Sequence, residues 1–181
     1  MVIHEGHRAR MRQQIELFGL DSLSDVQFLE VALYQVIPRG DTNELAHRLL
    51  TQFGSLSGVL EASRTALLEV EGVGARTADF LQLFLQMERR HMICRAGQDL
   101  ILDSTDKCGR YLLPYFLGEH EEVVWLLCLD GKCKMLDCRL IHRGAVNTAG
   151  ISVRKIVKTA LDHNATSVVL AHNHPSGIAL A

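Results

Sequence analysis

The stretch SVVLAHNHPSG, residues 167–177, carries the strongest indication of fold and chemistry in this chain. Its first five residues, Ser167 to Ala171, are mostly apolar and include two β-branched valines, which predicts a short buried strand. His172 and His174 follow directly, with one residue between them. Because neutral imidazole is a common zinc ligand, this spacing indicates two ligands of a metal site that requires further partners.

The segment that precedes this stretch alternates helix and strand patterns. Helices are expected at residues 104–117 and 153–161, and strands at residues 123–129 and 132–141. Asp130-Gly131, between the two strands, is a signal for a two-residue hairpin turn, which would place Cys128 directly opposite Cys133. The order of elements predicts a mixed α/β layer in which Glu122 begins one central strand and the histidine pair leaves another.

The first 98 residues are predicted to form an all-helical domain, joined to residues 99–181 by a short linker at Arg95–Gln98. Apolar residues recur at intervals of three and four, often after an Asp, Ser or Thr, at residues 8–18, 25–37, 44–53, 55–61, 64–70 and 75–92. Such short segments predict packed helices rather than strands.

Gly72-Val73-Gly74 lies between the last two of these helices and resembles the turn of a helix-hairpin-helix motif. Two glycines permit a tight turn, and the exposed amides at the start of the next helix can hold a DNA phosphate without reading base sequence. The DNA-contact candidates are therefore Gly72, Gly74 and Arg76, within an interface at residues 64–90. The alternative is a packing corner, because residues 1–100 carry 10 arginines against 13 acidic residues.

Composition and charge exclude several classes of protein. A hydrophobic fraction of 48% and a charged fraction of 22% are typical of a soluble globular chain with a buried core. No segment approaches the roughly 20 apolar residues that span a bilayer, and the charged residues 1–12 differ from a signal peptide. The five cysteines form no C-x-x-C pair and favour reduced thiols. We therefore expect a cytoplasmic protein without membrane contact.

Together these residues resemble the RadC-type family, whose C-terminal domain belongs to the JAMM, or MPN-plus, class of zinc metalloproteins. The resemblance covers nearly the whole chain and includes the Gly72-Val73-Gly74 hairpin, the glutamate before Val123-Val124, the Leu129-Asp130 turn and the block from Ala171 to Gly177. It implies an α+β protein with a helical helix-hairpin-helix domain over residues 1–98. Residues 99–181 would form an incomplete α/β domain of the JAMM/MPN type, which has a cytidine-deaminase-like fold.

The resemblance also implies roles for three residues. In the JAMM pattern, Glu122 is the general base, and His172 and His174 are zinc ligands. Zinc acidifies a water molecule, and a glutamate beside the metal can carry the proton to the leaving amine. The activity implied for the complete family site is metallopeptidase-type hydrolysis of an amide or isopeptide bond in a peptide or protein substrate.

The JAMM pattern continues beyond the last residue of this sequence. Its third ligand, an aspartate eleven residues after the second histidine, would stand at position 185 and its serine at position 182, whereas the sequence ends at Ala181. We therefore expect a truncated chain that binds Zn²⁺ weakly or not at all and has little or no hydrolytic activity. The alternative is a non-enzymatic module, associated with DNA repair, that binds DNA or a protein through the helical domain. The oligomeric state stays open.

Overall fold

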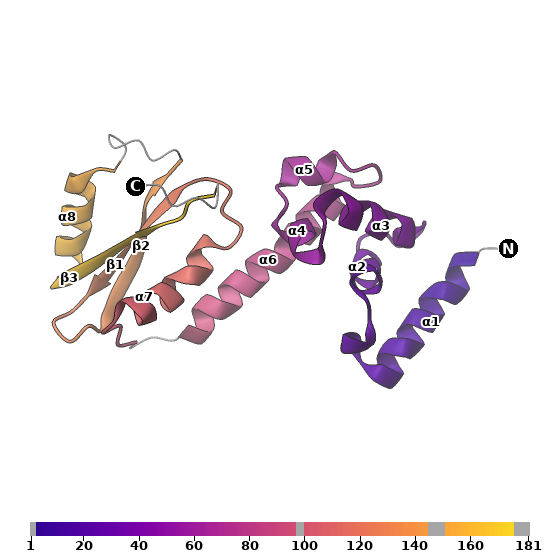
Figure 1. The fold of residues 1–181 in the computed structure, drawn as a ribbon, viewed down its shortest axis with the longest axis horizontal. Coiled ribbons are helices and arrows are strands. Elements are labelled where there is room, and N and C mark those ends of the chain that lie inside the picture. Colours follow the sequence, from indigo (N-terminus) through magenta and orange to yellow (C-terminus); the bar gives the residue numbers. More distant parts are fainter. Residues whose placement is uncertain (1–2, 97–99, 145–150, 176–181) are drawn as a thin grey trace. The chain divides into compact units, whose positions relative to one another are not determined.

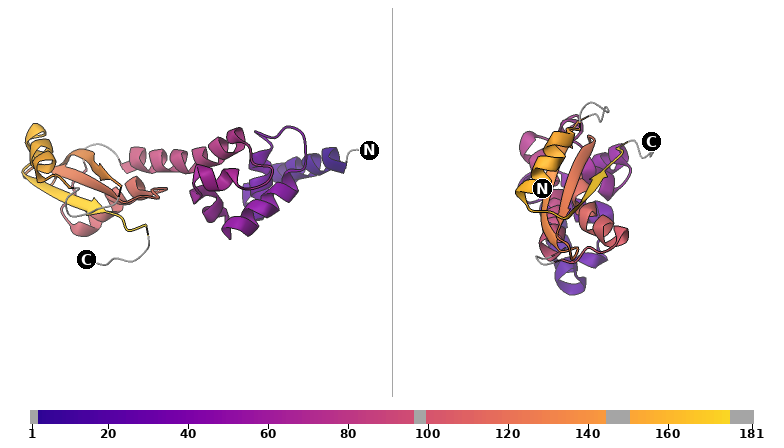
Figure 2. Two further views of the ribbon diagram at one scale, coloured as in Figure 1. Left: turned by 90° about the horizontal axis from the view of Figure 1, so that it is seen from above. Right: turned by 90° about the vertical axis from the view of Figure 1, so that its left-hand side faces the viewer.

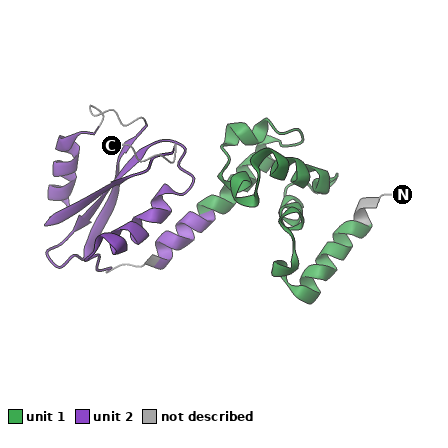
Figure 3. Ribbon diagram, viewed as in Figure 1, with its two compact units in different colours: residues 1–86 green, residues 87–181 purple. Residues whose placement is uncertain are grey.

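The computed structural model describes residues 3–96, 100–144 and 151–175. The chain divides into two compact units, unit 1 with residues 1–86 and unit 2 with residues 87–181 (Figure 3). This division falls within a helix, whereas the sequence predicts a domain boundary between residues 98 and 99. Residues 97–99 lie outside the described ranges, and the expected linker overlaps them, so that boundary stays a prediction.

Unit 1 is built from helices, as the apolar periodicity predicts. They are α1 (Ile3–Phe18), the 3₁₀ turn η1 (Leu20–Ser22), α2 (Asp25–Leu33), α3 (Thr42–Phe53), α4 (Leu56–Glu61), α5 (Arg64–Leu68) and the first part of α6 (Ala75–Ala96) (Figure 1). Side-chain oxygens cap the first backbone N–H groups of α2, α3, α4 and α5, from Ser24, Asp41, Ser55 and Ser63. None of the helices in the described part of the chain combines the length and the apolar character that crossing a bilayer requires.

One helix of unit 1 is shorter than the sequence predicts. The helix expected at residues 25–37 ends at Leu33. Val36 and Ile37 continue the apolar pattern, but they lie beyond the helix and pack against the core from there. Pro38 disfavours helical geometry in Ile37, the residue before it, so the helix does not extend through Ile37.

The core of unit 1 is a continuous aliphatic cluster. Its buried members come from α2 to α6 and are Leu29, Leu33, Leu45, Ala46, Leu49, Val59, Ala62, Leu67, Val70, Val73, Ala78 and Leu81. Burial of each large aliphatic side chain contributes about 1.5–3 kcal/mol to stability. Val70 and Val73 flank Gly72, so the hairpin between α5 and α6 is packed into this core.

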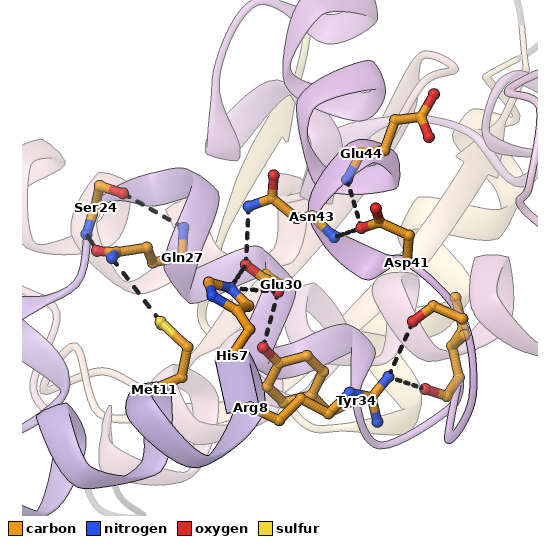
Figure 4. A network of polar contacts seen from close by, with 12 residues as sticks. His7, Arg8, Met11, Ser24, Gln27, Glu30, Tyr34, Asp41, Asn43 and Glu44 are labelled. Atoms are coloured by element: carbon orange, nitrogen blue, oxygen red, sulfur yellow. Dashed lines mark hydrogen bonds and ion pairs between the residues drawn. The ribbon is translucent and has the colours of Figure 1, made fainter. Parts of the chain in front are cut away.

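A buried carboxylate links α1, α2 and the start of α3 (Figure 4). The side chain of Glu30 is 2% exposed and accepts hydrogen bonds from Tyr34 Oη at 2.8 Å and Asn43 Nδ2 at 3.0 Å, while His7 Nε2 lies 3.0 Å from Oε1. The guanidinium of Arg8 stacks 4.3 Å from the centre of the Tyr34 ring. Burial by itself would raise the pKa of Glu30, but the hydrogen bonds from Asn43, His7 and Tyr34 hold it below its usual value. The charge is therefore kept in the interior.

Unit 2 contains a small antiparallel sheet with helices around it. After the second part of α6, its elements are α7 (Thr105–Leu112), the 3₁₀ turn η2 (Leu113–Phe116), β1 (Val123–Leu129), β2 (Met135–Arg143), α8 (Val153–Asp162) and β3 (Ser167–His172). Within the described residues, the strand order is β2-β1-β3, and β1 is antiparallel to both neighbours. The element order and the α+β class agree with the expectation from the sequence.

Each face of the sheet is covered by one helix (Figures 1 and 2). Leu127 and Leu129 of β1 pack with Leu112 of α7, in a cluster that also includes Val169 of β3. On the opposite face, Val124, Leu126 and Cys128 pack with Ile156 of α8. Because both faces of β1 are covered, the strand reads as a continuous apolar run, as buried strands do.

The turn between β1 and β2 is longer than the sequence predicts. Cys128 pairs with Asp137 rather than with Cys133, which lies in the turn itself with φ of 59°. The Asp130 carboxylate accepts a hydrogen bond from the N–H of Lys134 at 2.9 Å, and such Asx contacts stabilise a wider loop. The prediction of a cross-strand thiol pair was therefore wrong, and β2 starts at Met135 rather than near residue 132.

A second buried carboxylate organises the segment that leads into β1. The side chain of Glu119 is 6% exposed and lies 2.9 Å from Arg89 Nη1, and it is also paired with Arg143 of β2. Arg89 donates a further hydrogen bond to the carbonyl of Tyr115 at 2.9 Å. Burial opposes ionisation of Glu119, but the hydrogen bonds from Arg143 and Arg89 hold its pKa below the usual value. These contacts connect α6, the end of η2 and β2.

We predict that Glu119→Gln flattens the dependence of stability on pH. Because the folded-state pKa of Glu119 lies below its ordinary value of 4.5, its ionised form stabilises the fold above that pH, and the stabilisation is lost as the pH falls below it. At neutral pH the variant should have a free energy of unfolding lower by about 1–3 kcal/mol, since Arg143 is half-exposed. Urea titrations followed by the fluorescence of Trp125, the single tryptophan, measure both effects in unit 2.

Asp106→Asn is the matched control for this prediction. Asp106 pairs with Arg110 at the surface, where both side chains are well exposed, so its loss should cost less than about 0.5 kcal/mol. An unchanged pH dependence in Glu119→Gln would contradict the role given to Glu119.

Candidate metal centre

β3 brings the two histidines to the end of the sheet where β1 begins. In the antiparallel pairing of β1 with β3, the Cα partner of His172 is Val124. β3 ends at His172, and His174 follows just beyond it. The Nε2 atoms of the two rings lie 3.0 Å apart, and the rings meet edge to face with centroids 4.7 Å apart. The two imidazoles therefore converge on one place.

The separation of these nitrogens fits two ligands of one zinc ion. Two imidazoles bound to tetrahedral zinc at about 2.0–2.1 Å place their nitrogens about 3.3 Å apart. The 3.0 Å between the Nε2 atoms of His172 and His174 is close to that separation. His172 is exposed and His174 is half-buried, so the pair is open to solvent. Their assignment as zinc ligands stays a prediction, with a geometry that suits it.

Glu122 stands directly before β1, at the same end of the sheet as the histidine pair. It lies two positions before Val124, the partner of His172, and is half-buried. Its carbonyl accepts a hydrogen bond from the N–H of Gly144 at 2.9 Å, which ties it to the end of β2. The sheet thus brings the backbone of Glu122 and the histidine pair together, and the role of Glu122 as general base stays a prediction.

Asn173, between the two histidines, is a site residue that the sequence analysis missed. Its Oδ1 accepts from the backbone N–H of Val123 at 2.7 Å, and its Nδ2 donates to the carbonyl of Glu121 at 3.1 Å. The only signal in the sequence is a primary amide placed between two candidate ligands. Its partners lie fifty residues earlier and become visible only in the folded sheet.

The other titratable groups do not complete a metal site within the described residues. No three His, Cys, Asp or Glu side chains gather there in a way that could hold a metal ion. Asp137 is paired with Arg139 and lies 2.9 Å from His163 Nε2. Desolvation raises the pKa of the Cys138 thiol to about 12, which disfavours the thiolate that zinc requires. Ser176 and Gly177, which close the sequence motif, lie outside the described residues.

The hairpin in unit 1 has the turn that two glycines permit. Gly72 adopts φ of 93° between α5 and α6, a conformation that favours glycine. Arg76 is exposed near the start of α6, but Glu69 and Glu71 are exposed in the turn before it. These carboxylates would repel a phosphate. DNA contact through Gly72, Gly74 and Arg76 therefore stays a prediction, as does the identification of a helix-hairpin-helix motif.

Known proteins similar to this chain point to one family. The RadC-like JAB domain family model matches residues 102–180, which contain Glu122 and the histidine pair. A UPF0758 protein of Azotobacter vinelandii is 36% identical over 170 residues, which are 94% of this chain and 76% of that protein. UPF0758 proteins of Aliivibrio fischeri and Pseudomonas putida are 32% and 36% identical, over 94% and 93% of this chain and 76% and 74% of their own length.

These similarities extend over both units. The alignment with the Azotobacter vinelandii protein covers 94% of this chain, so it includes most of unit 1 as well as unit 2. The family model spans the sheet of unit 2 from before α7 to beyond β3. The chain belongs to the RadC-like family, to which the UPF0758 proteins also belong.

Proposed function

We propose that this chain carries the general base and two zinc ligands of a RadC-like metallopeptidase, which hydrolyses an amide or isopeptide bond in a peptide or protein. The observation that carries the proposal is the pair of imidazole nitrogens, 3.0 Å apart, at the end of the sheet where Glu122 precedes β1. The similarity to the RadC-like JAB domain supports it as well. We expect the protein to act in the cytoplasm, as its composition and cysteine usage indicate.

Each of the three residues has a defined task in this proposal. His172 and His174, as neutral imidazoles, bind and orient the metal through Nε2. When bound, zinc supplies a Lewis acid that polarises the scissile carbonyl group and makes a water molecule more acidic. The Glu122 carboxylate accepts the proton of the attacking water and then donates it to the nitrogen of the leaving amine.

Two imidazoles are an incomplete ligand set, because catalytic zinc sites normally have three protein ligands. The family pattern expects the third, an aspartate, at position 185 and a serine that binds the oxyanion at position 182, outside the 181 residues of this sequence. We therefore expect these residues by themselves to bind zinc weakly. Full activity should require the two additional side chains.

We predict weak zinc binding through the histidine pair of the 181-residue chain. The expected dissociation constant is micromolar or weaker, because two imidazoles are fewer protein ligands than a catalytic zinc site normally has. His172→Ala and His174→Ala should each abolish this binding, whereas His47→Ala, which removes an exposed histidine of unit 1, should leave it unchanged. Isothermal titration with Zn²⁺ measures the affinity. Submicromolar binding would contradict the expected weak affinity, and binding that survives in His172→Ala would contradict the assignment of the ligands.

We predict that Glu122 is required for hydrolysis but not for zinc binding. The test uses an extended chain, in which residues 1–181 are followed by a segment with serine at position 182 and aspartate at position 185. In the extended chain, Glu122→Gln should bind zinc as tightly as the parent and lose at least about a hundredfold in kcat on a fluorogenic peptide and isopeptide library. Glu121→Gln, at the exposed neighbouring position, is the control and should keep its activity. Activity retained in Glu122→Gln would reject the assigned base.

A second proposal is that unit 1 acts as a DNA-binding module. The specific observation in its favour is the turn at Gly72, with φ of 93°, followed by an exposed Arg76 near the start of α6. A helix start that follows such a turn presents free backbone N–H groups, which are suited to a phosphate. This proposal concerns contact with the DNA backbone and implies no recognition of base sequence.

We predict salt-dependent binding of the full chain to a fluorescent DNA duplex if the second proposal is correct. Arg76→Ala should weaken binding uniformly across sequences and lower the slope of log affinity against log salt by about one unit. Arg39→Ala, which removes another exposed arginine of unit 1, serves as the control and should leave the slope unchanged. Fluorescence anisotropy at several salt concentrations gives the slope. Absence of binding at low salt would exclude the DNA proposal.

A further inference from the structure

One side chain bridges the peptide groups on both sides of Glu122. Asn173 Oδ1 accepts from the N–H of Val123 at 2.7 Å, and this N–H belongs to the peptide group that follows Glu122. Asn173 Nδ2 donates to the carbonyl of Glu121 at 3.1 Å, and this carbonyl belongs to the peptide group that precedes Glu122. The backbone of Glu122 is therefore clamped by a single amide.

The clamp lies where regular strand pairing ends. On the β3 side of β1, the register of backbone pairs begins with Val124 and His172, and Glu121 and Val123 lie just beyond it. The side chain of Asn173 takes over the hydrogen bonds there. On the β2 side, the carbonyl of Glu122 accepts from the N–H of Gly144 at 2.9 Å. The segment is thus held from both neighbouring strands.

Only a primary amide of this length can make both contacts of the clamp. It offers an acceptor and a donor on one planar group, whereas a carboxylate has acceptors only and a hydroxyl side chain is shorter. The backbone of Asn173 also joins His172 to His174. The position of Glu122 relative to the two imidazoles is therefore coupled to one residue.

We propose that Asn173 is a positioning residue, which places Glu122 relative to the metal-binding histidines. This inference rests on the proposed metallopeptidase function and gives Asn173 no contact with the metal or the substrate. Substitution of a residue that holds a catalytic group in place typically lowers activity or metal affinity by about 10–100-fold. If Asn173 acts through Glu122, substitution of Asn173 must slow the proton-transfer step and leave the zinc affinity unchanged.

The first measurement uses the 181-residue chain and needs no activity. Amide hydrogen exchange followed by NMR reports the contact with the N–H of Val123. Asn173→Ala removes the acceptor, so exchange at Val123 should accelerate at least about tenfold. Asn173→Asp keeps the acceptor and loses the donor. The amide of Val123 should therefore stay protected from exchange, and only the hydrogen bond to the carbonyl of Glu121 should be lost. Zinc affinity in both variants should stay within about threefold of the parent, in contrast to His172→Ala.

The second measurement is a double-mutant cycle of Asn173 and Glu122, with kcat as the readout. In the zinc-loaded extended chain, Asn173→Ala should lower kcat about 10–100-fold with little change in KM. Combined with Glu122→Gln, it should cause no further loss, because two residues that act as a unit are not additive. Asn164→Gly is the matched control. Asn164 is a second asparagine of unit 2, and its φ of 51° accommodates glycine, so activity should be unchanged.

The outcomes separate the inference from the proposed function. A loss that persists in the Glu122→Gln background, or a parallel loss of zinc affinity, would overturn the positioning role. Parent-like kcat in both Asn173→Ala and Asn173→Asp would overturn it too. Absence of hydrolysis in every extended chain, with normal zinc binding and the expected exchange at Val123, would instead refute the metallopeptidase function. Fluorescence of Trp125 confirms that unit 2 is folded in each variant.

Discussion

The antiparallel pairing of β1 with β3 is the interaction on which the candidate site depends. It aligns Val124 with His172 and so brings Glu122 to the same end of the sheet as two imidazoles that follow it by fifty residues or more in the chain. Without this pairing, a glutamate before one strand and a histidine pair after another would have no reason to be near each other. The chemistry proposed for this protein is therefore a consequence of strand register.

The register of β3 is supported by the apolar cluster on the α7 face of the sheet, in which Val169 and Ala171 pack. The face of β1 that contains Val124 packs against α8, and the face that contains Leu127 packs against α7. Residues directly opposite each other in an antiparallel pair lie on the same face, so His172 shares the α8 face with Val124. A slip of β3 by one residue would move every side chain of that strand to the other face and take Val169 and Ala171 away from the α7 cluster. The hydrophobic core thus selects where the histidines lie.

Hydrogen bonds and ion pairs fix the segment that leads into β1 more closely than apolar packing alone. Among the described residues, unit 1 contains the buried carboxylate of Glu30 and unit 2 that of Glu119, and each accepts hydrogen bonds from two or more donors. A buried charge is tolerated only when it is satisfied in this way, and removal of one partner is costly. Glu119 lies three residues before Glu122. Asn173 binds the peptide groups on both sides of Glu122. The segment that carries the expected base is therefore held by charge pairing on one side and by an amide clamp on the other.

The sequence by itself determined the elements and the candidate chemistry, because these depend on neighbours along the chain. Apolar periodicity and capping residues act within a few positions, so the helices of unit 1, the strand before the histidine pair and the His-x-His spacing could all be identified. The tertiary structure alone decided the role of Asn173 and the wide turn that carries Cys133, whose carbonyl accepts a hydrogen bond from the N–H of Leu102. These features depend on hydrogen bonds and packing between distant segments. Local propensity does not encode them, since a side-chain amide finds its partners only after β1 and β3 have paired in the correct register.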